Sequence, residues 1–376
     1  WDEASSEWAD AVGETFTAGE GMLVNYPDED NEQTLAGVFN KGDQSISLVN
    51  SGTDLLSGWN LAGNPYTSAI DWDAVSLDPN INPAIYVYDS QAKVFKLYQQ
   101  NGIQLNDGSR YIMAGDAFMA QTAADADLIL TSDAQAHYMA SPGATENTVS
   151  QLLKFKLEGN GVSDEAAVHF AEGASEGLDT QFDAEKIMNF DEEALNVFTK
   201  STSTDYAHQF AINTLNESGA EYTIPLGFTV PESGTYEISL LTNTLANSAV
   251  SVELKDLVTG DVQDLKTDPV YSFEHTAGTK SERFNLIVGE GVSGFEVNFN
   301  VTDGNDALSG ASVTIQETDE TLTTDAAGTA TTDLQDGTYN YEVSLDGYQT
   351  HTGTFTVEGS DENVDVVLDE ATGIEQ

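Results

Sequence analysis

Residues 336–348 read Asp-Gly-Thr-Tyr-Asn-Tyr-Glu-Val-Ser-Leu-Asp-Gly-Tyr, and this stretch decides the fold at the end of the chain. Apolar and polar side chains alternate between two Asp-Gly turns, which is the period-2 pattern of a half-buried β-strand. The same alternation occurs at residues 295–301 and 311–315, and residues 325–328 supply a further turn. Residues 291–370 are therefore predicted to form one compact β-domain.

Two further β-rich regions precede this domain. Residues 1–142 contain short alternating strands between Gly, Asn and Asp turns, with the clearest at 44–49 and a buried one at 128–130. Residues 143–290 contain several strands at regular spacing, which is typical of a β-sandwich. Within that region a helical turn is expected only at about residues 183–198. The predicted fold class is all-β, with tandem β-rich modules and β-sandwiches.

The pattern Gly-Thr-Tyr-x-Tyr-x-Val at 337–343, followed by Gly347-Tyr348, resembles the carboxypeptidase-regulatory-like and B-type immunoglobulin-like modules of surface proteins. The resemblance implies that residues 291–370 form a rigid seven-strand immunoglobulin-like sandwich that serves as a spacer.

An internal repeat relates residues 15–24 to residues 111–120. Each copy follows an aromatic-Asp turn, Trp1-Asp2 in the first copy and Tyr88-Asp89 in the second. A strand leads into the second turn, whereas nothing precedes Trp1, so the chain is expected to start partway through a repeat of a larger surface protein.

The composition is strongly acidic, with 64 Asp and Glu against 12 Lys and Arg and a formal net charge of -52. A surface field of this sign repels nucleic acid and anionic membranes, so neither is an expected partner. It also opposes self-association unless salt or divalent cations screen it. No apolar run is long enough to cross a membrane.

The last residues, 371–376, resemble the linker that precedes the C-terminal sorting domain of type IX secreted proteins of the Bacteroidota, with the sorting domain removed. The body of the chain resembles β-rich modules of Bacteroidota surface and adhesin-like proteins. The residues that carry this resemblance are 16–24, 58–66, 71–72, 108–111, 115, 159–165, 173–179, 183, 186 and 225–228. The resemblance implies a non-catalytic protein outside the cell or on its surface that is exported by the type IX machinery.

Nothing in the sequence identifies an active site. The chain has no cysteine, which excludes disulfides, thiol nucleophiles and thiolate metal sites. Residues 173–177 match G-x-S-x-G, but they lie in an acidic stretch that reads as a loop, without the strand and helix of a nucleophile elbow. The five histidines lie far apart, and 64 acids make any chosen carboxylate pair uninformative. The chain is predicted not to be an enzyme.

Calcium is the expected cofactor, because hard cations prefer several oxygen ligands on one turn. Three acidic turns offer this arrangement, although none has EF-hand spacing. The candidate ligands are Asp28, Asp30, Glu32, Asp179, Asp183, Asp303, Asn305 and Asp306. For each turn the competing interpretation is a solvated acidic loop.

Aromatic residues at 58–72 admit two interpretations. Trp59, Tyr66 and Trp72 supply core area if they point inward, and a sugar-binding platform if they are exposed. The leading functional hypothesis is a structural or adhesive stalk or fibre component that associates with itself or with neighbouring modules. The alternative is a carbohydrate-binding accessory region of a larger secreted polysaccharide hydrolase, with surface glycans as partners.

Overall fold

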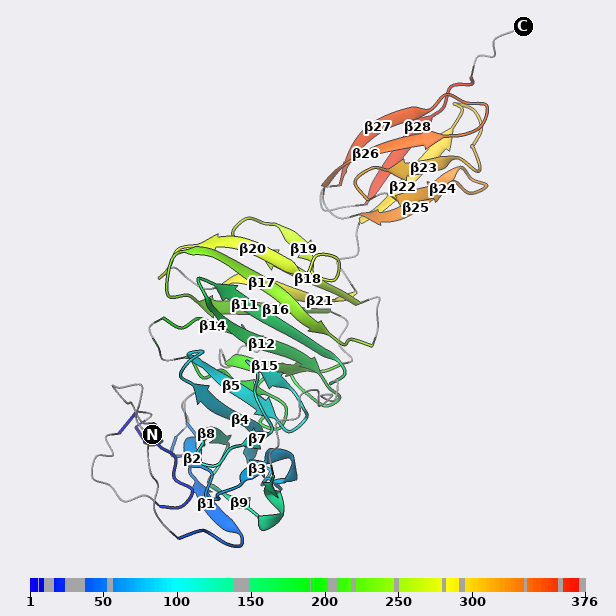
Figure 1. The fold of residues 1–376 in the computed structure, drawn as a ribbon. Helices are drawn as coiled ribbons and strands as arrows, with labels where there is room; N and C mark the ends of the chain where they lie inside the picture. The colour runs from blue at the N-terminus through cyan, green and yellow to red at the C-terminus, as the bar shows by residue number, and fades with distance from the viewer. Residues whose placement is uncertain are drawn as a thin grey trace. The chain divides into compact units, whose positions relative to one another are not determined.

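The chain forms two compact units in the computed structural model, Trp1–Gly289 and Glu290–Gln376 (Figure 1). The structure describes residues 1–5, 7–9, 17–23, 38–52, 57–137, 149–189, 191, 193–201, 208–217, 221–246, 250–278, 282–290, 295–318, 320–334, 337–357 and 361–371. These residues form strands and two short 3-10 helices, η1 (Trp72–Ala74) and η2 (Ser132–Ala134), and no α-helix. The prediction of an all-β fold is confirmed.

The division at 289/290 lies one residue from the predicted boundary at 290/291. The other predicted boundary, 142/143, lies inside the first unit and outside the described residues. We call residues 1–137 and 149–289 the first and second halves of that unit. A single apolar cluster contains buried side chains from both halves, including Tyr86 and Phe95 of the first and Ala167 and Ile212 of the second.

Three antiparallel sheets build the first half. The largest has the order β2-β8-β4-β5-β6, formed by β2 (Trp59–Gly63), β4 (Ile81–Asp89), β5 (Val94–Gln99), β6 (Gln104–Leu105) and β8 (Ala117–Thr122). The smaller sheets pair β1 (Gln44–Leu48) with β9 (Ala126–Leu130), and β3 (Ala69–Asp71) with β7 (Tyr111–Ile112) and β10 (Gln135–Ala136). Their inward side chains share one core that includes Trp72, Phe118 and Leu128.

The internal repeat has a structural counterpart in two equivalent turns. Gly19 and Gly115 have φ angles of 91° and 90°, a left-handed conformation that favours glycine. In each turn an acid follows the glycine and exchanges two hydrogen bonds with the residue three positions earlier. The backbone N–H of the acid, Glu20 or Asp116, donates to the carbonyl of that residue. The carboxylate of the acid accepts the N–H of the same residue. The turns lie on opposite sides of β2, because Gly19 O accepts from Gly63 N and Asp116 O accepts from Asn64 N. The repeat residues 15, 16 and 24 lie outside the described part of the chain.

The aromatic-Asp turns also match. Asp2 and Asp89 each accept two backbone N–H groups of the following turn on Oδ1. The flanking rings pack together, with centroids 5.6 Å apart for Trp1 and Trp8 and 5.2 Å apart for Tyr88 and Phe95. The sequence repeat therefore corresponds to a repeated hairpin and turn.

One 11-stranded sheet forms the second half, with the order β19-β18-β21-β16-β14-β15-β12-β11-β17-β20 and β13 paired with β15. Its strands are β11 (Leu152–Gly159), β12 (Val162–Phe170), β13 (Ala184–Glu185), β14 (Asn196–Lys200), β15 (Gln209–Leu215), β16 (Glu221–Thr229), β17 (Gly234–Asn243), β18 (Val250–Asp256), β19 (Val262–Asp264), β20 (Val270–His275) and β21 (Glu282–Glu290). Phe155 of β11 and Phe284 of β21 belong to one buried cluster although their strands are distant in the sheet order. The sheet therefore folds over this core as a two-layer sandwich. Within 183–198, where a helical turn was expected, the described residues contain β13 and the start of β14 instead.

The second unit is a sandwich of a three-stranded and a four-stranded sheet. The first sheet contains β22 (Phe295–Thr302), β25 (Thr329–Leu334) and β28 (Glu362–Val367), and the second contains β23 (Ser312–Ile315), β24 (Glu320–Thr323), β26 (Gly337–Ser344) and β27 (His351–Val357). Tyr341 and Val343 of β26 are buried while Asn340 and Glu342 are exposed, as the alternation in the sequence predicted. Phe299 meets Tyr341 and Phe355 edge-on in the core.

Candidate functional site

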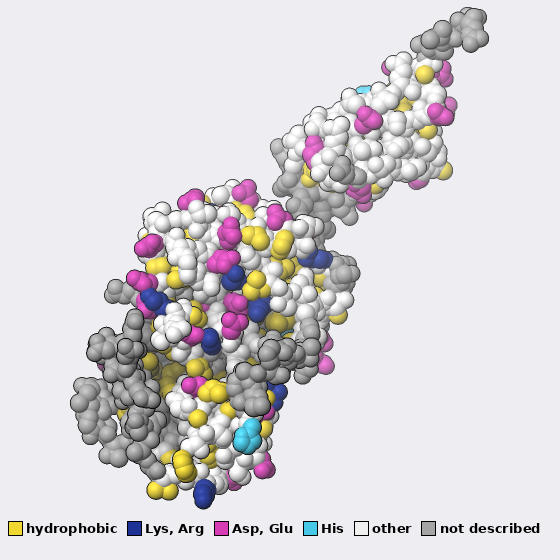
Figure 2. Space-filling view, viewed as in Figure 1, with side chains coloured by type: hydrophobic (Ala, Val, Ile, Leu, Met, Phe, Trp, Pro, Cys, Tyr) yellow, Lys and Arg dark blue, Asp and Glu magenta, His cyan; other side chains and the backbone are white. Residues whose placement is uncertain are grey.

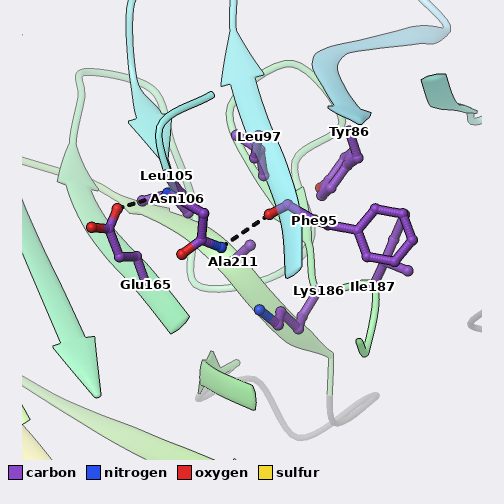
Figure 3. A pocket seen from close by; sticks show the side chains of 9 residues that line it. All are labelled: Tyr86, Phe95, Leu97, Leu105, Asn106, Glu165, Lys186, Ile187 and Ala211. Carbon is purple, nitrogen blue, oxygen red and sulfur yellow. Dashed lines mark hydrogen bonds between the residues drawn. The ribbon is translucent and has the colours of Figure 1, made fainter. Parts of the chain in front are cut away.

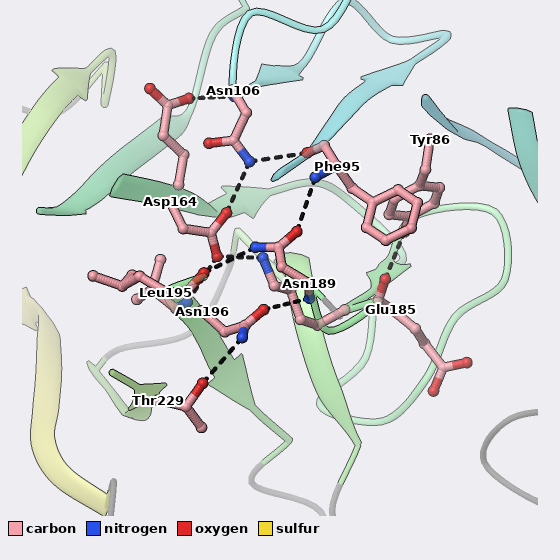
Figure 4. Close-up of polar contacts among 12 residues, drawn as sticks. Tyr86, Phe95, Asn106, Asp164, Glu185, Asn189, Leu195, Asn196 and Thr229 are labelled. Atoms are coloured by element: carbon pink, nitrogen blue, oxygen red, sulfur yellow. Dashed lines mark hydrogen bonds and ion pairs between the residues drawn. The ribbon is translucent and has the colours of Figure 1, made fainter. Parts of the chain in front are cut away.

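A polar junction lies between the two halves of the first unit. It is formed by Asn106, Asp164, Glu165, Lys186, Asn189 and Asn196, and apolar side chains surround it. Figure 3 shows the pocket at this place, and Figure 4 shows the polar contacts around it. The residues come from the turn after β6, from β12, from the segment between β13 and β14, and from the first residue of β14. The junction thus joins segments that are distant in the sequence.

Asp164 is the centre of this junction. It is completely buried, on the face of β12 that also presents Ala166 and Val168 to the core. Its Oδ1 accepts Asn106 Nδ2–H at 2.8 Å, and its Oδ2 accepts the backbone N–H of Val197 at 2.8 Å and an ion pair from Lys186. The Lys186 side chain is only 4% exposed. A buried charge requires such partners, so this arrangement fixes both halves around Asp164.

Asn106 is held in one orientation by its backbone and its neighbours. Its φ angle is 54°, in the left-handed region that asparagine tolerates better than most residues. Its N–H donates to Glu165 Oε2 at 2.8 Å, and its Nδ2 also donates to Phe95 O at 2.9 Å. Gly108, two residues on, packs so closely that a Cβ there would lie 1.8 Å from Leu97 O. The close packing of this turn and its hydrogen bonds hold the Asn106 amide against Asp164.

Asn189 and Asn196 of the second half add further bonds within the junction (Figure 4). Asn189 Oδ1 accepts the Phe95 N–H at 2.9 Å, and Asn189 Nδ2 donates to Leu195 O at 2.9 Å. Asn196 Oδ1 accepts the Asn189 N–H at 2.6 Å, and Asn196 Nδ2 donates to Thr229 Oγ1 at 3.0 Å. These bonds tie β5 of the first half to β14 and β16 of the second.

Tyr86 adds a second link. Its hydroxyl donates to Glu185 O at 2.6 Å. Burial, and then the nearby charge of Glu185, raise the pKa of Tyr86 well above its ordinary value, which keeps the phenol protonated as a donor. The Glu185 carboxylate in turn contacts Gln121 and His208 Nδ1, the latter at 2.7 Å.

The open space in this junction is about 10 Å³. A volume of this size holds about one water molecule, whereas pockets for small molecules measure roughly 300–1,000 Å³. The polar groups of the junction are therefore arranged to bind one another across the two halves, and no sugar or other small substrate fits among them.

The sequence-predicted acids Asp179 and Asp183 lie in one loop, where backbone N–H groups occupy their carboxylates. Asp183 is completely buried and accepts Thr214 N at 2.6 Å on Oδ1 and Asp179 N at 2.7 Å on Oδ2. Asp179 Oδ2 accepts Ser175 N at 2.6 Å. Burial raises the pKa of Asp183 to about 7, although the two N–H bonds act in the opposite direction.

This raised pKa gives the first unit a specific pH dependence. Between about pH 4 and pH 7 the folded state binds a proton at Asp183 that the unfolded state has released, so this group's contribution to stability falls as the pH rises, by up to about 1.4 kcal/mol per pH unit. We expect the difference in free energy of unfolding between the wild type and Asp183→Asn to change with pH across this window. Urea unfolding at several pH values measures it, and a difference that stays constant from pH 4 to pH 7 contradicts the assignment.

The third predicted cluster forms a turn between strands of the second unit. Asp303 Oδ1 accepts the N–H groups of Asn305 and Asp306 at 2.9 and 2.8 Å. These backbone bonds lower the pKa of Asp303. The first cluster, Asp28, Asp30 and Glu32, lies outside the described residues. In the part of the chain that the structure describes, no group of three or more His, Asp or Glu side chains is placed to hold a metal ion. Calcium binding stays a prediction.

The aromatic side chains Trp59, Tyr66 and Trp72 do not form an exposed platform, which corrects their assignment as a ligand-binding set. Their exposed fractions are 4%, 4% and 0%. Trp72 Nε1 donates to Pro83 O at 2.8 Å, and the Tyr66 hydroxyl donates to Leu130 O at 2.6 Å. The rings face inward because their apolar area is stabilised in the core while their polar atoms find backbone acceptors there.

The G-x-S-x-G stretch at 173–177 is a loop, as predicted. Ser175 Oγ accepts the Gly177 N–H at 3.2 Å, and Gly173 has a φ of 86°. Sequence reasoning missed the polar junction itself. A signal was present, because Asp164 occupies an inward position of an alternating strand, where a charge requires a buried partner.

The chain thus consists of a β-rich first unit followed by a carboxypeptidase regulatory-like domain. The family model of that domain matches residues 297–369. The family model described as "Domain of unknown function (DUF8693)" matches residues 1–288, and the chain belongs to this family. No curated protein matches the chain. Among solved structures, the Bacillus anthracis TIE protein is similar at 11% identity over 89% of this chain and 76% of that one, but its TM-score of 0.18 supports no argument.

Proposed function

We propose that the chain is a non-catalytic structural or adhesive component of an extracellular stalk or fibre. The observation that carries this proposal is the polar junction, where Asp164 of the second half binds both Asn106 of the first half and Lys186, beside a space of about 10 Å³. Buried polar groups that satisfy each other rigidify a protein and specify one arrangement. A stiff spacer needs one rigid arrangement of its parts, whereas an open binding site does not require its polar groups to bind one another.

Other features support the same proposal. The second unit matches a domain type that resembles rigid spacers in surface proteins, and its strands form a seven-strand sandwich. Acidic side chains are scattered over the face seen in Figure 2, which favours solubility outside the cell. Among the described residues no helix is long and apolar enough to cross a membrane. Export by the type IX machinery of the Bacteroidota, with adhesion at the cell surface, is the part of the proposal that rests on sequence resemblance.

Self-association should depend on divalent cations. A chain with a formal net charge of -52 repels its own copies, and screening or bridging by calcium reduces that repulsion. We expect light scattering to give a higher mass in millimolar calcium than in chelator. Sodium chloride at matched ionic strength is the control, because it screens charge without bridging carboxylates. Identical mass in calcium and in chelator contradicts the proposed assembly.

A further inference from the structure

We propose that Lys186 and Asn106 are joined by an intramolecular amide bond between Lys186 Nζ and Asn106 Cγ, with Asp164 as the proton carrier. This inference concerns a covalent modification within the first unit and does not depend on the proposed function. It rests on three side chains that the fold brings together from the turn after β6, from β12 and from the segment after β13.

The first argument is the way in which one carboxylate bridges the two reacting groups. Asp164 Oδ1 accepts Asn106 Nδ2–H at 2.8 Å, and Asp164 Oδ2 forms the ion pair with Lys186 Nζ. Lys186 and Asn106 also line the same small space, as Figure 3 shows. The amine, the amide and the group that can move a proton between them are therefore adjacent.

The second argument is burial. The side chains of Lys186 and Asp164 are 4% and 0% exposed, and the small space that Lys186 lines is also lined by Phe95, Leu97 and Ile187, among other residues. An ammonium group has three N–H donors, and within the described residues Asp164 is the acceptor found for Lys186. Proton transfer from a buried amine to its carboxylate removes both charges from a site where charge is costly. The neutral amine is the nucleophile that the reaction requires.

The third argument is the fixed orientation of the amide. The Asn106 N–H is bound to Glu165, and Asn106 Nδ2 is bound to both Phe95 O and Asp164. Nδ2 is the atom that must receive a proton before it leaves, and it already contacts the carboxylate that would supply the proton. Holding both reactants in place lowers the entropic cost of the reaction.

The step balances without any oxidant or reductant. The Nζ–Cγ bond forms and the Cγ–Nδ2 bond of Asn106 breaks. Lys186 begins as an ammonium and loses two protons, which pass by way of Asp164 to the departing nitrogen, so that nitrogen leaves as ammonium. Asp164 ends as it began, as a carboxylate. The product is a neutral amide that links the two halves of the first unit.

The test is the intact mass of the purified full chain under denaturing conditions, followed by peptide mapping. We expect a mass lower than the sequence predicts by about 17 Da, the mass of ammonia, and a linked peptide pair that contains residues 106 and 186. A full sequence mass overturns the proposal. A loss of about 18 Da with Lys186 linked to residue 164 also overturns it, because the carboxyl of Asp164 is then the acceptor and water the leaving group.

Variants separate the bond from the fold. Lys186→Arg should restore the full mass, because it removes the reacting amine. Asp164→Asn should also restore the full mass, because it removes the proton carrier while both reacting side chains, Lys186 and Asn106, are kept. Lys154→Arg is the matched control, because Lys154 is a partly exposed lysine paired with Glu165 at 3.5 Å, and it should keep the mass deficit. If the buried-site variants do not fold, the wild-type mass and peptide map still decide the question.

Discussion

Replacing Asp256 with alanine is expected to lower the free energy of unfolding of the first unit by about 3–5 kcal/mol, the range for removing one partner of a buried ion pair. Asp256 is completely buried at the end of β18, and the Arg283 side chain is 10% exposed. Arg283 Nε and Nη2 both donate to the Asp256 carboxylate, the latter at 2.6 Å. Alanine would leave a guanidinium in the core without its counter-charge.

Neighbouring groups increase this effect. The Asp256 carboxylate also accepts Tyr271 OH at 3.0 Å and Val258 N at 2.9 Å, while the Arg283 guanidinium lies 4.8 Å from the centre of the Phe273 ring. Burial works to raise the pKa of Asp256, but the bonds from Arg283, Val258 and Tyr271 outweigh it and hold the pKa below its ordinary value of 3.8. The corresponding stability is present above that value and is lost as the pH falls through the lower, folded-state pKa.

Urea unfolding of the purified protein measures this loss. The matched control is Glu282→Ala, which removes the partner of Lys200 in a pair whose glutamate side chain is 60% exposed. Exposed pairs contribute about 0–1 kcal/mol, so this control should unfold almost as the wild type does. Equal losses in the two variants would show that the Asp256–Arg283 pair does not stabilise the sandwich.

Trp72→Ala is expected to lower the free energy of unfolding by about 3–5 kcal/mol, as for other large aromatic residues removed from a core. Trp72 is 0% exposed, and its ring lies edge-on to Phe118 with centroids 5.7 Å apart. Its Nε1–H bond to Pro83 O at 2.8 Å is lost as well, which leaves a carbonyl without that donor. The cavity and the unpaired carbonyl both destabilise the first half.

Thermal and urea unfolding together check this result, with Ile129→Ala as the control. Ile129 is 48% exposed on β9, next to the completely buried Leu128, so its truncation should cost about 0.5 kcal/mol or less. Retained stability in the Trp72 variant would contradict the placement of Trp72 in the core. It would restore the possibility of a sugar-binding ring.

The sequence by itself determined which segments become strands and where they turn. The alternation at 337–344 predicted the inward Tyr341 and Val343 of β26, because successive side chains of a strand point to opposite faces. The sequence repeat of 15–24 in 111–120 indicated a repeated unit, and the structure shows equivalent turns there, in which Gly19 and Gly115 have the same left-handed backbone. These features are local, so nearby residues suffice to specify them.

Only the tertiary structure decided which distant groups meet. Asn106, Asp164 and Lys186 come from three separate segments, and their contacts follow from how the two halves of the first unit pack. Tertiary packing also buries Trp59, Tyr66 and Trp72, the latter two in the core of the first half, although their residue types fit either a core or a sugar platform. Strand periodicity tells which side chains share a face of their own sheet, but it contains no information on what covers that face. Side-chain pairing across a core depends on contacts between residues far apart in the chain, and these exist only once the sheets have packed.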